Sequence, residues 1–332
     1  MQIGVVGAGS WGTTLADMLA RNGHDVRLWA REAEVVESIR KDRVNTVFLP
    51  ESPLQESIEV SGEIAEVVSN AEIVVSAAPS HAVRAVGQQI ADAIGSAAPL
   101  VVSVSKGLEP GTHHTMTHVL EELVPHCGVV ALSGPSFARE VYRRRPTAVV
   151  AASADVIAAE KTQRSFSNSE FRVYTSTDVL GVQLGGALKN VVAIAAGVLD
   201  GLDLGSNPRA ALITRGLAET SRLGEELGAD PHTFSGLAGM GDLILTATGA
   251  LSRNRSLGLE LAKGRNLDEI LAERKTVAEG VNTAQVAVEL SAITGVELPI
   301  ASEVAQVLFH GKTPQDAIRD LMDRELKSER WR

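Results

Sequence analysis

The residue that first suggests chemistry is Lys189, which stands in the apolar run GGALKNVVAIAAGVLDG from Gly185 to Gly201. The run predicts a buried helix, and lysine is rarely buried unless it is paired. Burial disfavours the ammonium form and lowers its pKa toward the range in which a general acid or base operates. The alternative without a functional role is a lysine whose methylene groups cover apolar surface while its ammonium group reaches water.

Lys106 and Asp242 stand at two further positions where ligands gather. Lys106 lies in VSVSKGLE, where an expected strand runs out into a loop, and the carboxyl ends of parallel strands are common ligand sites. Asp242 follows glycine-rich turns in GLAGMGDLILTATG. Taken alone, Lys106 fits a surface loop cation better than a site residue, and Asp242 could simply cap the helix that begins DLIL.

Two segments have the composition of anion sites. SGPSFA (133–138) follows a strand, and Pro135 and Ser136 are expected to open a helix with free amide groups. SRNRS leads into another expected helix. The guanidinium of Arg253 can therefore bind a phosphate group through two hydrogen bonds, beside the free amides at the helix start. A surface ion pair is the alternative for Arg253.

The N-terminal segment carries a dinucleotide-binding pattern. GAGSWG, from Gly7 to Gly12, is G-x-G-x-x-G directly after a strand and at the start of a helix. Gly7 allows the tight turn, Gly9 lets pyrophosphate approach, and Gly12 lets helix and strand pack closely. Arg31 follows the second strand where an acidic residue usually selects NAD, so we hypothesise that NADPH is accepted. A solvated Arg31 is the alternative.

The histidines give no persuasive metal site. His114 and His118 are four residues apart, a spacing that can hold zinc on one helix face. No Glu follows His114 directly and no third ligand is evident, so we predict no metal.

These residues need a scaffold of two parts. Strands are expected at 2–7, 25–30, 72–79, 100–105, 128–134 and 147–153, with helices between most of them. This alternation predicts a Rossmann-type, doubly wound parallel sheet over residues 1–175. From 176 to 332 the pattern is helical, with segments at 179–199, 209–227, 257–262, 268–274, 283–293 and 300–308. We therefore predict an α/β part followed by an all-α part.

Composition narrows the function classes. The 332 residues carry a net charge of −10 and 3% aromatic residues, which disfavours nucleic-acid binding. The single cysteine, Cys127, excludes an internal disulfide and fits a reducing compartment. No secretory leader is evident, and no apolar run approaches the about 20 residues that span a bilayer. A cytoplasmic protein without membrane insertion is expected.

Taken in order, the motifs resemble one family. GAGSWGTTLA, VSKGLE, SGPSFA, GGALKNVVAIAAG, ALITRGLAE, GLAGMGDL and SRNRSLG look like the bacterial type of NAD(P)-dependent glycerol-3-phosphate dehydrogenase. The resemblance runs from the first residues to about Glu279. It implies reversible hydride transfer between NAD(P)H and the C2 carbonyl of dihydroxyacetone phosphate, giving sn-glycerol 3-phosphate for phospholipid synthesis. It also implies a cytoplasmic homodimer.

The resemblance assigns roles to individual residues. Lys189 would be the catalytic acid–base, Lys106 would help polarise the carbonyl, and Asp242 would orient Lys189. The implied substrate contacts are Lys106, Gly134, Ser136, Lys189, Asp242, Thr246, Ser252, Arg253 and Asn254, the last two holding the phosphate. The implied NAD or NADP contacts are Gly7, Gly9, Ser10, Trp11, Gly12, Arg31, Lys106, Ala138, Arg253 and Glu279.

Two other functions compete with this one. Another dehydrogenase of the Rossmann-plus-helical type, acting on a hydroxyacid or phosphogluconate, would also use a helical lysine. A non-catalytic nucleotide-sensing module would keep GAGSWG and need neither Lys106 nor Lys189. Both lysines are present, and SRNRSLG with VSKGLE favours a small phosphorylated triose.

Overall fold

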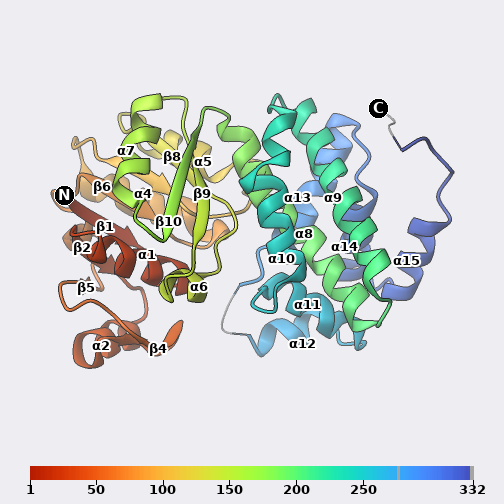
Figure 1. Ribbon diagram of the computed structural model, residues 1–332, viewed down its shortest axis with the longest axis horizontal. Coiled ribbons are helices and arrows are strands. Elements are labelled where there is room, and N and C mark those ends of the chain that lie inside the picture. The colour runs from red at the N-terminus through yellow and green to blue at the C-terminus, as the bar shows by residue number, and fades with distance from the viewer. Residues whose placement is uncertain (275–276, 330–332) are drawn as a thin grey trace.

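A computed structural model describes residues 1–274 and 277–329. Its N-terminal part is built on a sheet and its C-terminal part is helical, and the two lie side by side (Figure 1). The sheet has eight strands in the order β10-β9-β8-β7-β6-β1-β2-β5. Their bounds are β1 (Gln2–Val6), β2 (Asp25–Trp29), β5 (Glu59–Ser61), β6 (Ile73–Ser76), β7 (Leu100–Ser103), β8 (Val129–Ser133), β9 (Thr147–Ala152) and β10 (Phe171–Ser176).

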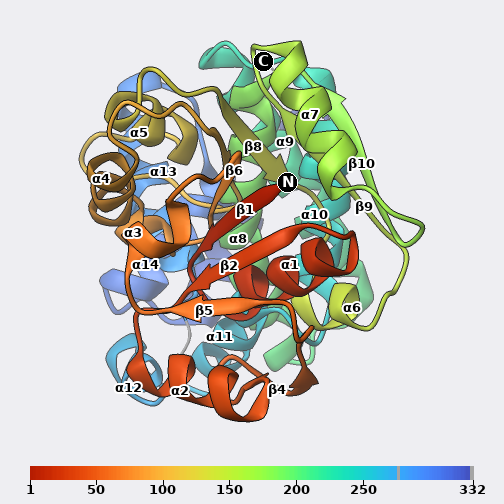
Figure 2. The same ribbon diagram turned by 90° about the vertical axis from the view of Figure 1, so that its left-hand side faces the viewer.

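Helices cover both faces of this sheet. Figure 2 shows α3, α4 and α5 on one side and α1 and α7 on the other. The helices are α1 (Ser10–Arg21), α2 (Ala33–Asp42), α3 (Ile64–Val68), α4 (Val83–Ile94), α5 (Met116–Leu123), α6 (Ala138–Tyr142) and α7 (Val156–Phe166). A short hairpin of β3 (Val44–Asn45) and β4 (Leu49–Pro53) lies outside the main sheet. The Rossmann-type prediction is confirmed.

One detail of the parallel sheet is corrected. β9 runs antiparallel to β8, with Ser133 opposite Val150, and β10 then runs parallel to β9. The chain between β8 and β9 carries only the short helix α6, so β9 starts at the edge where β8 ends. The edge strands β5 and β10 and the β3–β4 hairpin were also absent from the sequence prediction. β10 alternates buried and exposed side chains in its first half, which gives a weaker apolar signal than a central strand.

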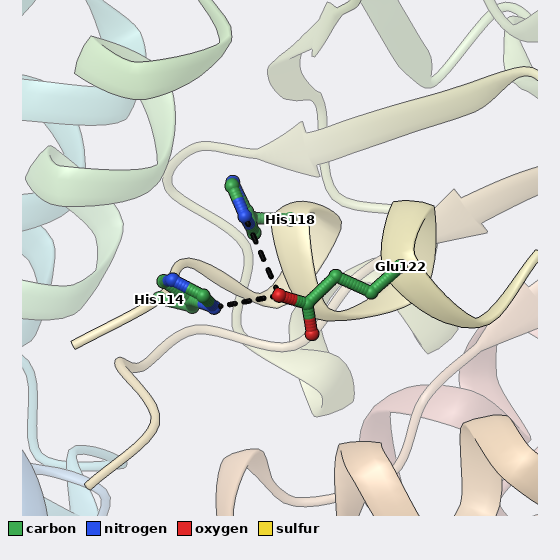
Figure 3. Close-up of side chains that lie close together, drawn as sticks. All are labelled: His114, His118 and Glu122. Atoms are coloured by element: carbon green, nitrogen blue, oxygen red, sulfur yellow. Dashed lines mark ion pairs between the residues drawn. The ribbon is translucent and has the colours of Figure 1, made fainter. Parts of the chain in front are cut away.

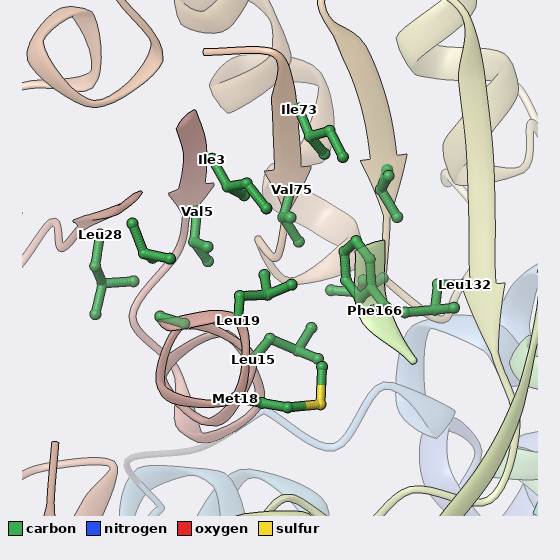
Figure 4. Packing of buried hydrophobic residues seen from close by; sticks show 14 of the residues in the cluster. Ile3, Val5, Leu15, Met18, Leu19, Leu28, Ile73, Val75, Leu132 and Phe166 are labelled. Carbon is green, nitrogen blue, oxygen red and sulfur yellow. The ribbon is translucent and has the colours of Figure 1, made fainter. Parts of the chain in front are cut away.

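The core explains why the central strands are almost wholly apolar. Side chains of one sheet face pack on α1 and α7, as Figure 4 shows for Val5 and Val75 above Leu19 and for Leu132 near Phe166. Side chains of the other face pack on α3, α4 and α5. Burial on both faces fixes the carboxyl ends of β1, β6, β7 and β8 along one edge, and the predicted site residues follow these ends.

The helical part is organised around one central helix, α8 (Val179–Gly201), which contacts α9, α10, α11, α13 and α14. The further helices are α9 (Ser206–Glu226), α10 (Asp242–Thr248), α11 (Arg253–Ala262), α12 (Leu267–Ala272), α13 (Gly280–Thr294), α14 (Pro299–Phe309) and α15 (Pro314–Met322). A 3₁₀ turn (Pro231–Ser235) and a π-helical turn (Leu237–Gly241) precede α10. α15 was not predicted from the sequence.

α8 also corrects the expectation about apolar runs. It is the one helix in the described residues that is long and apolar enough to cross a membrane, with a mean hydropathy of 1.5 over its most apolar window. However, 83% of that window is buried inside the protein. The apolarity of α8 is therefore accounted for by its packing against the surrounding helices.

The start of α8 is fixed by side-chain capping. Asp178 accepts a hydrogen bond from the Gly181 amide at 2.9 Å, and its other oxygen accepts from the Asp230 amide and the Thr233 hydroxyl. Such a cap satisfies amides that have no partner within the helix. β10 ends at Ser176, so we place the change from sheet to helices between Ser176 and Val179.

Candidate active site

Lys189 lies in the middle of α8 and is 7% exposed. Its Nζ donates hydrogen bonds to Asp242 Oδ1 and to Thr246 Oγ1, each at 2.7 Å. The pKa of Lys189 is lowered to about 8, chiefly by burial, with Lys106 and Arg253 contributing to the shift and Asp242 opposing it. Lys189 is therefore neither a snorkelling lysine nor an ordinary surface cation. Its ammonium group is held near its titration point by burial and partners.

Asp242 joins this lysine to a second one. Its Oδ2 accepts from Lys106 Nζ at 2.7 Å while Oδ1 faces Lys189, so one carboxylate spans two ammonium groups. Burial would raise the pKa of Asp242, but the two lysines outweigh burial and hold it below the ordinary value. Asp242 is the first residue of α10, and no side-chain cap is found at that helix start. The predicted alternative of Asp242 as a cap is wrong because both carboxylate oxygens are used by the lysines.

Local backbone geometry brings these groups together. The π-helical turn over Leu237–Gly241 delivers Asp242 to the side of α8, and such turns are common at functional sites. Gly185 lies where a Cβ would be 2.7 Å from the Ala238 carbonyl oxygen. A Cβ on Gly186 would be 2.7 Å from Ser133 Oγ and 3.6 Å from Lys106 Cγ. The two glycines before Lys189 thus let the turn and the Lys106 side chain approach the helix.

Gly134 and Ser136 complete the sheet side of this cluster. The Gly134 carbonyl accepts from Lys106 Nζ at 2.8 Å and from Ser136 Oγ at 3.0 Å. Gly134 has a φ of +138° and lies against the backbone of Val149, a conformation and a space that favour glycine. The expectation that Pro135 and Ser136 open a helix is corrected, because α6 begins at Ala138.

Arg253 lies near Lys189 at the start of α11. It is surrounded by protein atoms, and burial lowers the pKa of its guanidinium while Glu279 opposes the shift. The residue nevertheless keeps an exposed surface, so its guanidinium can meet a ligand from solvent. Arginine remains charged at neutral pH, and its fork suits phosphate oxygens. Lys106, Lys189 and Arg253 therefore form a local cationic group in a protein of net negative charge.

Ser252 and Asn254 flank Arg253 but are already engaged. Ser252 is the N-cap of α11, and its hydroxyl accepts from the Arg255 amide at 3.1 Å. Asn254 donates to Asn190 Oδ1 at 2.8 Å and accepts from the Gly280 amide at 3.0 Å. Asn254 thereby connects α11 to α8 next to Lys189 and to the start of α13.

The glycine-rich turn fits a pyrophosphate group. Gly7 has a φ of +124°, and a Cβ there would be 2.7 Å from the Ala77 carbonyl oxygen. A Cβ on Gly12 would collide with the Gly7 carbonyl oxygen, so this glycine serves helix–strand packing. Gly9 has φ −64°, and a Cβ there would meet no protein atom within 4 Å. The open space beside Gly9 and the first-turn amides of α1, from Ser10 to Gly12, are what an anionic dinucleotide backbone requires.

Sequence reasoning missed the residues that hold this turn. Asn45 is fully buried and donates to the Ala8 carbonyl at 2.8 Å and to Thr13 Oγ1 at 2.9 Å. Thr14 donates to the Ala138 carbonyl at 3.3 Å, which brings the predicted cofactor residue Ala138 against α1. Asn45 lies on the short hairpin, and no local pattern in its sequence marks this contact.

The remaining predicted cofactor residues lie apart from one another. The Trp11 ring packs near Phe171, with ring centroids 6.5 Å apart. Arg31 follows β2 with an exposed side chain and pairs with Glu32 at 2.7 Å. Glu279 precedes α13 and accepts from both the amide and the hydroxyl of Ser80, beyond the end of β6. Ser80 is a second residue that sequence reasoning missed, and its contact ties the helical part to the sheet.

The structure thus brings Lys106, Gly134, Lys189, Asp242 and Thr246 into one hydrogen-bonded cluster. Arg253 lies close enough to shift the pKa of Lys189, and Glu279 close enough to shift that of Arg253. None of the described contacts links Arg31 to this cluster.

Comparisons with known proteins identify the family of this chain. Residues 2–159 match the family model for the N-terminus of NAD-dependent glycerol-3-phosphate dehydrogenase, and residues 178–319 match the model for its C-terminus. Over 99% of both chains, the protein is 53% identical to a relative from Geobacter sulfurreducens named glycerol-3-phosphate dehydrogenase (NAD(P)+). A relative of the same name from Myxococcus xanthus is 51% identical over 99% of both chains.

A solved structure has the same fold throughout. The crystal structure of glycerol-3-phosphate dehydrogenase from Coxiella burnetii superposes with a TM-score of 0.93 at 36% identity, covering 97% of this chain and 98% of that one. The resemblance drawn from the sequence is therefore confirmed. This chain belongs to the NAD-dependent glycerol-3-phosphate dehydrogenase family.

Proposed function

We propose that this protein catalyses reversible hydride transfer between NAD(P)H and dihydroxyacetone phosphate, with Lys189 as the group that donates or accepts the proton. The observation that carries the proposal is the buried arrangement in which Asp242 bridges Lys189 and Lys106 at 2.7 Å on each side. This pairing keeps two ammonium groups together, and Lys106 follows β7 at the same edge of the sheet where the glycine-rich turn follows β1.

Lys189 has the protonation behaviour that the reaction needs. With a pKa of about 8, it is mostly an ammonium at neutral pH, yet it can lose its proton without a large cost. In the direction of reduction, Lys189 gives a proton to the substrate oxygen as that oxygen becomes an alkoxide. In the direction of oxidation, the neutral amine accepts the proton of the hydroxyl group. A bound reduced nicotinamide supplies the hydride.

Lys106 and Asp242 have different tasks. Lys106 lies beside the site, where its ammonium group stabilises negative charge that develops on the substrate oxygen. Asp242 holds both lysines in place and prevents the pKa of Lys189 from falling further. The Thr246 hydroxyl accepts from Lys189 Nζ and fixes the direction in which the ammonium points.

The substrate phosphate would be held at the start of α11. Arg253 supplies a charged fork there, and the helix start adds free amides. Asn254, whose side chain is bound to Asn190 and Gly280, would act by fixing this helix start rather than by a free side-chain contact. The product, sn-glycerol 3-phosphate, would supply the backbone of phospholipids.

We also propose that the protein works as a homodimer in the cytoplasm. Large apolar side chains are exposed on the helical part, among them Leu204, Met240, Ile244 and Leu251, and they support an interface on that side. Sedimentation velocity at several protein concentrations tests this proposal. A single species with the mass of one chain at every concentration would refute it.

The test of the reaction is the loss of reduced-nicotinamide absorbance with dihydroxyacetone phosphate, measured for the wild type and for Lys189→Ala, with NADH and NADPH in separate assays. We expect turnover in the wild type and a fall of about 10²-fold to 10⁴-fold in the variant, the usual contribution of a general acid. Cofactor binding, measured by nicotinamide fluorescence, should be unchanged. Turnover of the folded variant at the wild-type rate would exclude Lys189 as the proton donor.

A further inference from the structure

A second cluster of ionisable side chains lies on and just before α5 and takes no part in the proposed reaction. It consists of His114, His118 and Glu122 (Figure 3). Glu122 Oε1 lies 3.2 Å from His114 Nδ1 and 3.6 Å from His118 Nε2. One ligand atom from each of the three residues lies within 4.8 Å of the others.

The structure corrects the sequence prediction here in two respects. α5 begins at Met116 with Thr115 as its N-cap, so His114 precedes the helix instead of lying on its face. The chain nevertheless turns the two imidazoles together, with ring centroids 4.0 Å apart. Glu122, one helical turn beyond His118, supplies a third ligand-type atom near the two imidazoles, which the sequence did not reveal.

We propose that His114, His118 and Glu122 bind a single divalent transition-metal ion of the Zn²⁺ class. Two imidazole nitrogens and a carboxylate oxygen are a common zinc ligand set, with solvent able to take the fourth position. In a tetrahedral site with bonds of about 2.0–2.1 Å, neighbouring ligand atoms are about 3.3 Å apart. Both measured distances to Glu122 Oε1 are close to this value, so small side-chain rotations complete the site.

The polar atoms of the cluster support a ligand in place of a simple ion pair. His114 Nδ1 is buried and makes no hydrogen bond within the described residues, although Glu122 Oε1 is near. A buried nitrogen without a hydrogen bond is costly unless something else satisfies it. The two imidazole rings are tilted by 40° to each other with centroids 4.0 Å apart, which is close enough for both to bind one metal ion.

Arg84 holds the carboxylate for this role. Its Nη2 donates to Glu122 Oε2 at 2.7 Å, which leaves Oε1 facing the histidines. The same guanidinium forms a two-pronged pair with Glu109 at 2.7 and 2.8 Å. The hydrogen bond from Arg84 orients the Glu122 carboxylate as a metal ligand requires. Together, one guanidinium and two carboxylates leave a single negative charge, which favours a cation.

The position of the cluster suggests what a bound ion would do. The segment from Lys106 to His114 follows β7 and begins with Lys106, the lysine proposed to stabilise charge on the substrate oxygen. An antiparallel bridge between Leu108 and Thr115 joins its two ends. A metal ion bound by His114, His118 and Glu122 would fasten the end of this segment to α5. The ion would therefore stabilise the fold around Lys106 without touching the substrate.

The experiment titrates metal-free full-length protein with Zn²⁺ by calorimetry and with Co²⁺ by visible absorption. We expect one strong equivalent of Zn²⁺, the absorption bands of four-coordinate Co²⁺, and a higher melting temperature with Zn²⁺. In His118→Ala and Glu122→Gln, the affinity for Zn²⁺ should fall at least about tenfold. Substitution of residues that only hydrogen-bond to metal ligands already causes a loss of about this size. His310→Ala removes an exposed histidine at the end of α14 and should bind as the wild type does.

Several results would overturn the proposal. If the wild-type protein binds no Zn²⁺, the cluster is an ion pair only. The same conclusion follows if His310→Ala lowers the Zn²⁺ affinity as much as His118→Ala does. Far-ultraviolet circular dichroism identifies a variant that fails to fold. If His118→Ala does not fold, the Zn²⁺ affinity of Glu122→Gln, which keeps the shape of the side chain, tests the proposal. The calorimetric and spectroscopic readouts do not depend on turnover, so failure here leaves the proposed reaction untouched.

Discussion

Lys189 Nζ lies 2.7 Å from Asp242 Oδ1, and the second oxygen of that carboxylate lies 2.7 Å from Lys106 Nζ. The charge of Asp242 is therefore shared by two cations, of which Lys189 is the more deeply buried. In this geometry, the protonation state of Lys189 depends on a residue 53 positions away in the sequence.

Asp242→Asn tests this dependence. Asp242 raises the pKa of Lys189 against the effect of burial, so its neutralisation should move that pKa below about 8. Reduction needs the protonated lysine, so the rate should fall as pH rises through this pKa, and the fall should start at lower pH in the variant. The measurement is the pH dependence of kcat with dihydroxyacetone phosphate. A profile that scales down without moving would contradict the proposed coupling.

The same substitution should also cost stability, because it leaves two neighbouring ammonium groups without the charge between them. Removing one partner of a buried ion pair typically costs about 3–5 kcal/mol. Thermal unfolding of Asp242→Asn should be compared with that of Asp316→Asn, which changes a half-exposed acidic residue that pairs with Arg319 on α15. Equal melting temperatures for these two variants would argue against a buried charged pair.

Gly9→Ala and Gly12→Ala should separate ligand binding from packing. A methyl group at Gly9 meets no protein atom, whereas one at Gly12 collides with the Gly7 carbonyl oxygen. Gly9→Ala should keep the wild-type melting temperature but raise the KM for NADH and NADPH by at least about tenfold, because the methyl group occupies the pyrophosphate position. Gly12→Ala should lose about 1–3 kcal/mol of unfolding free energy. An unchanged KM for both cofactors in Gly9→Ala would show that the cofactor does not bind against this turn.

Arg31→Ala tests cofactor preference. The side chain is exposed and paired only with its neighbour Glu32 among the described contacts, so it is available for a 2′-phosphate at little cost. We expect the KM for NADPH to rise at least about tenfold while the KM for NADH changes little. Arg27→Ala, which removes an arginine within β2 paired with Glu59, is the matched control. Equal effects on both cofactors would exclude a role for Arg31 in selecting the phosphate.

Glu219 gives a prediction about stability and pH. This residue is buried in α9, and burial raises its pKa to about 7, while the amides of Ile300 and Ala301 oppose the shift. The folded state holds this proton more tightly than the unfolded state, so the stabilisation is full below about pH 4.5 and is lost as pH rises to about 7. At about 1.4 kcal/mol per pH unit, the loss is on the order of 3 kcal/mol.

Glu219→Gln should remove this dependence, because the amide cannot ionise. The wild type should lose stability relative to the variant between pH 5 and pH 8, as measured by urea unfolding at several pH values. Glu226→Gln, an exposed position at the end of the same helix, should follow the wild type at every pH. Parallel curves for wild type and Glu219→Gln would show that Glu219 ionises normally in the folded protein.

The sequence by itself determined the two-part architecture and the family. Apolar strands alternating with helices require a buried parallel sheet, and a long small-residue helix requires a surrounding helical part. The glycines around the nucleotide turn and before Lys189 are visible as local sequence patterns, although Gly7, Gly185 and Gly186 approach atoms of segments distant in the sequence. The edge strands β5 and β10 escaped prediction, since a partly exposed strand has a weaker apolar signal.

Only the tertiary structure decided which side chains meet. Nothing in the local sequence pairs Lys106 with Asp242, Asn45 with the Ala8 carbonyl, Ser80 with Glu279, or Glu122 with His114. The structure also showed that Ser252 caps its helix and that Asn254 is bound to Asn190, both of which were expected to face substrate. A sequence pattern shows which side chains of one segment are buried and which face water. These contacts instead join segments that are distant in the sequence, and the packing of helices and strands sets the distance between such segments in space.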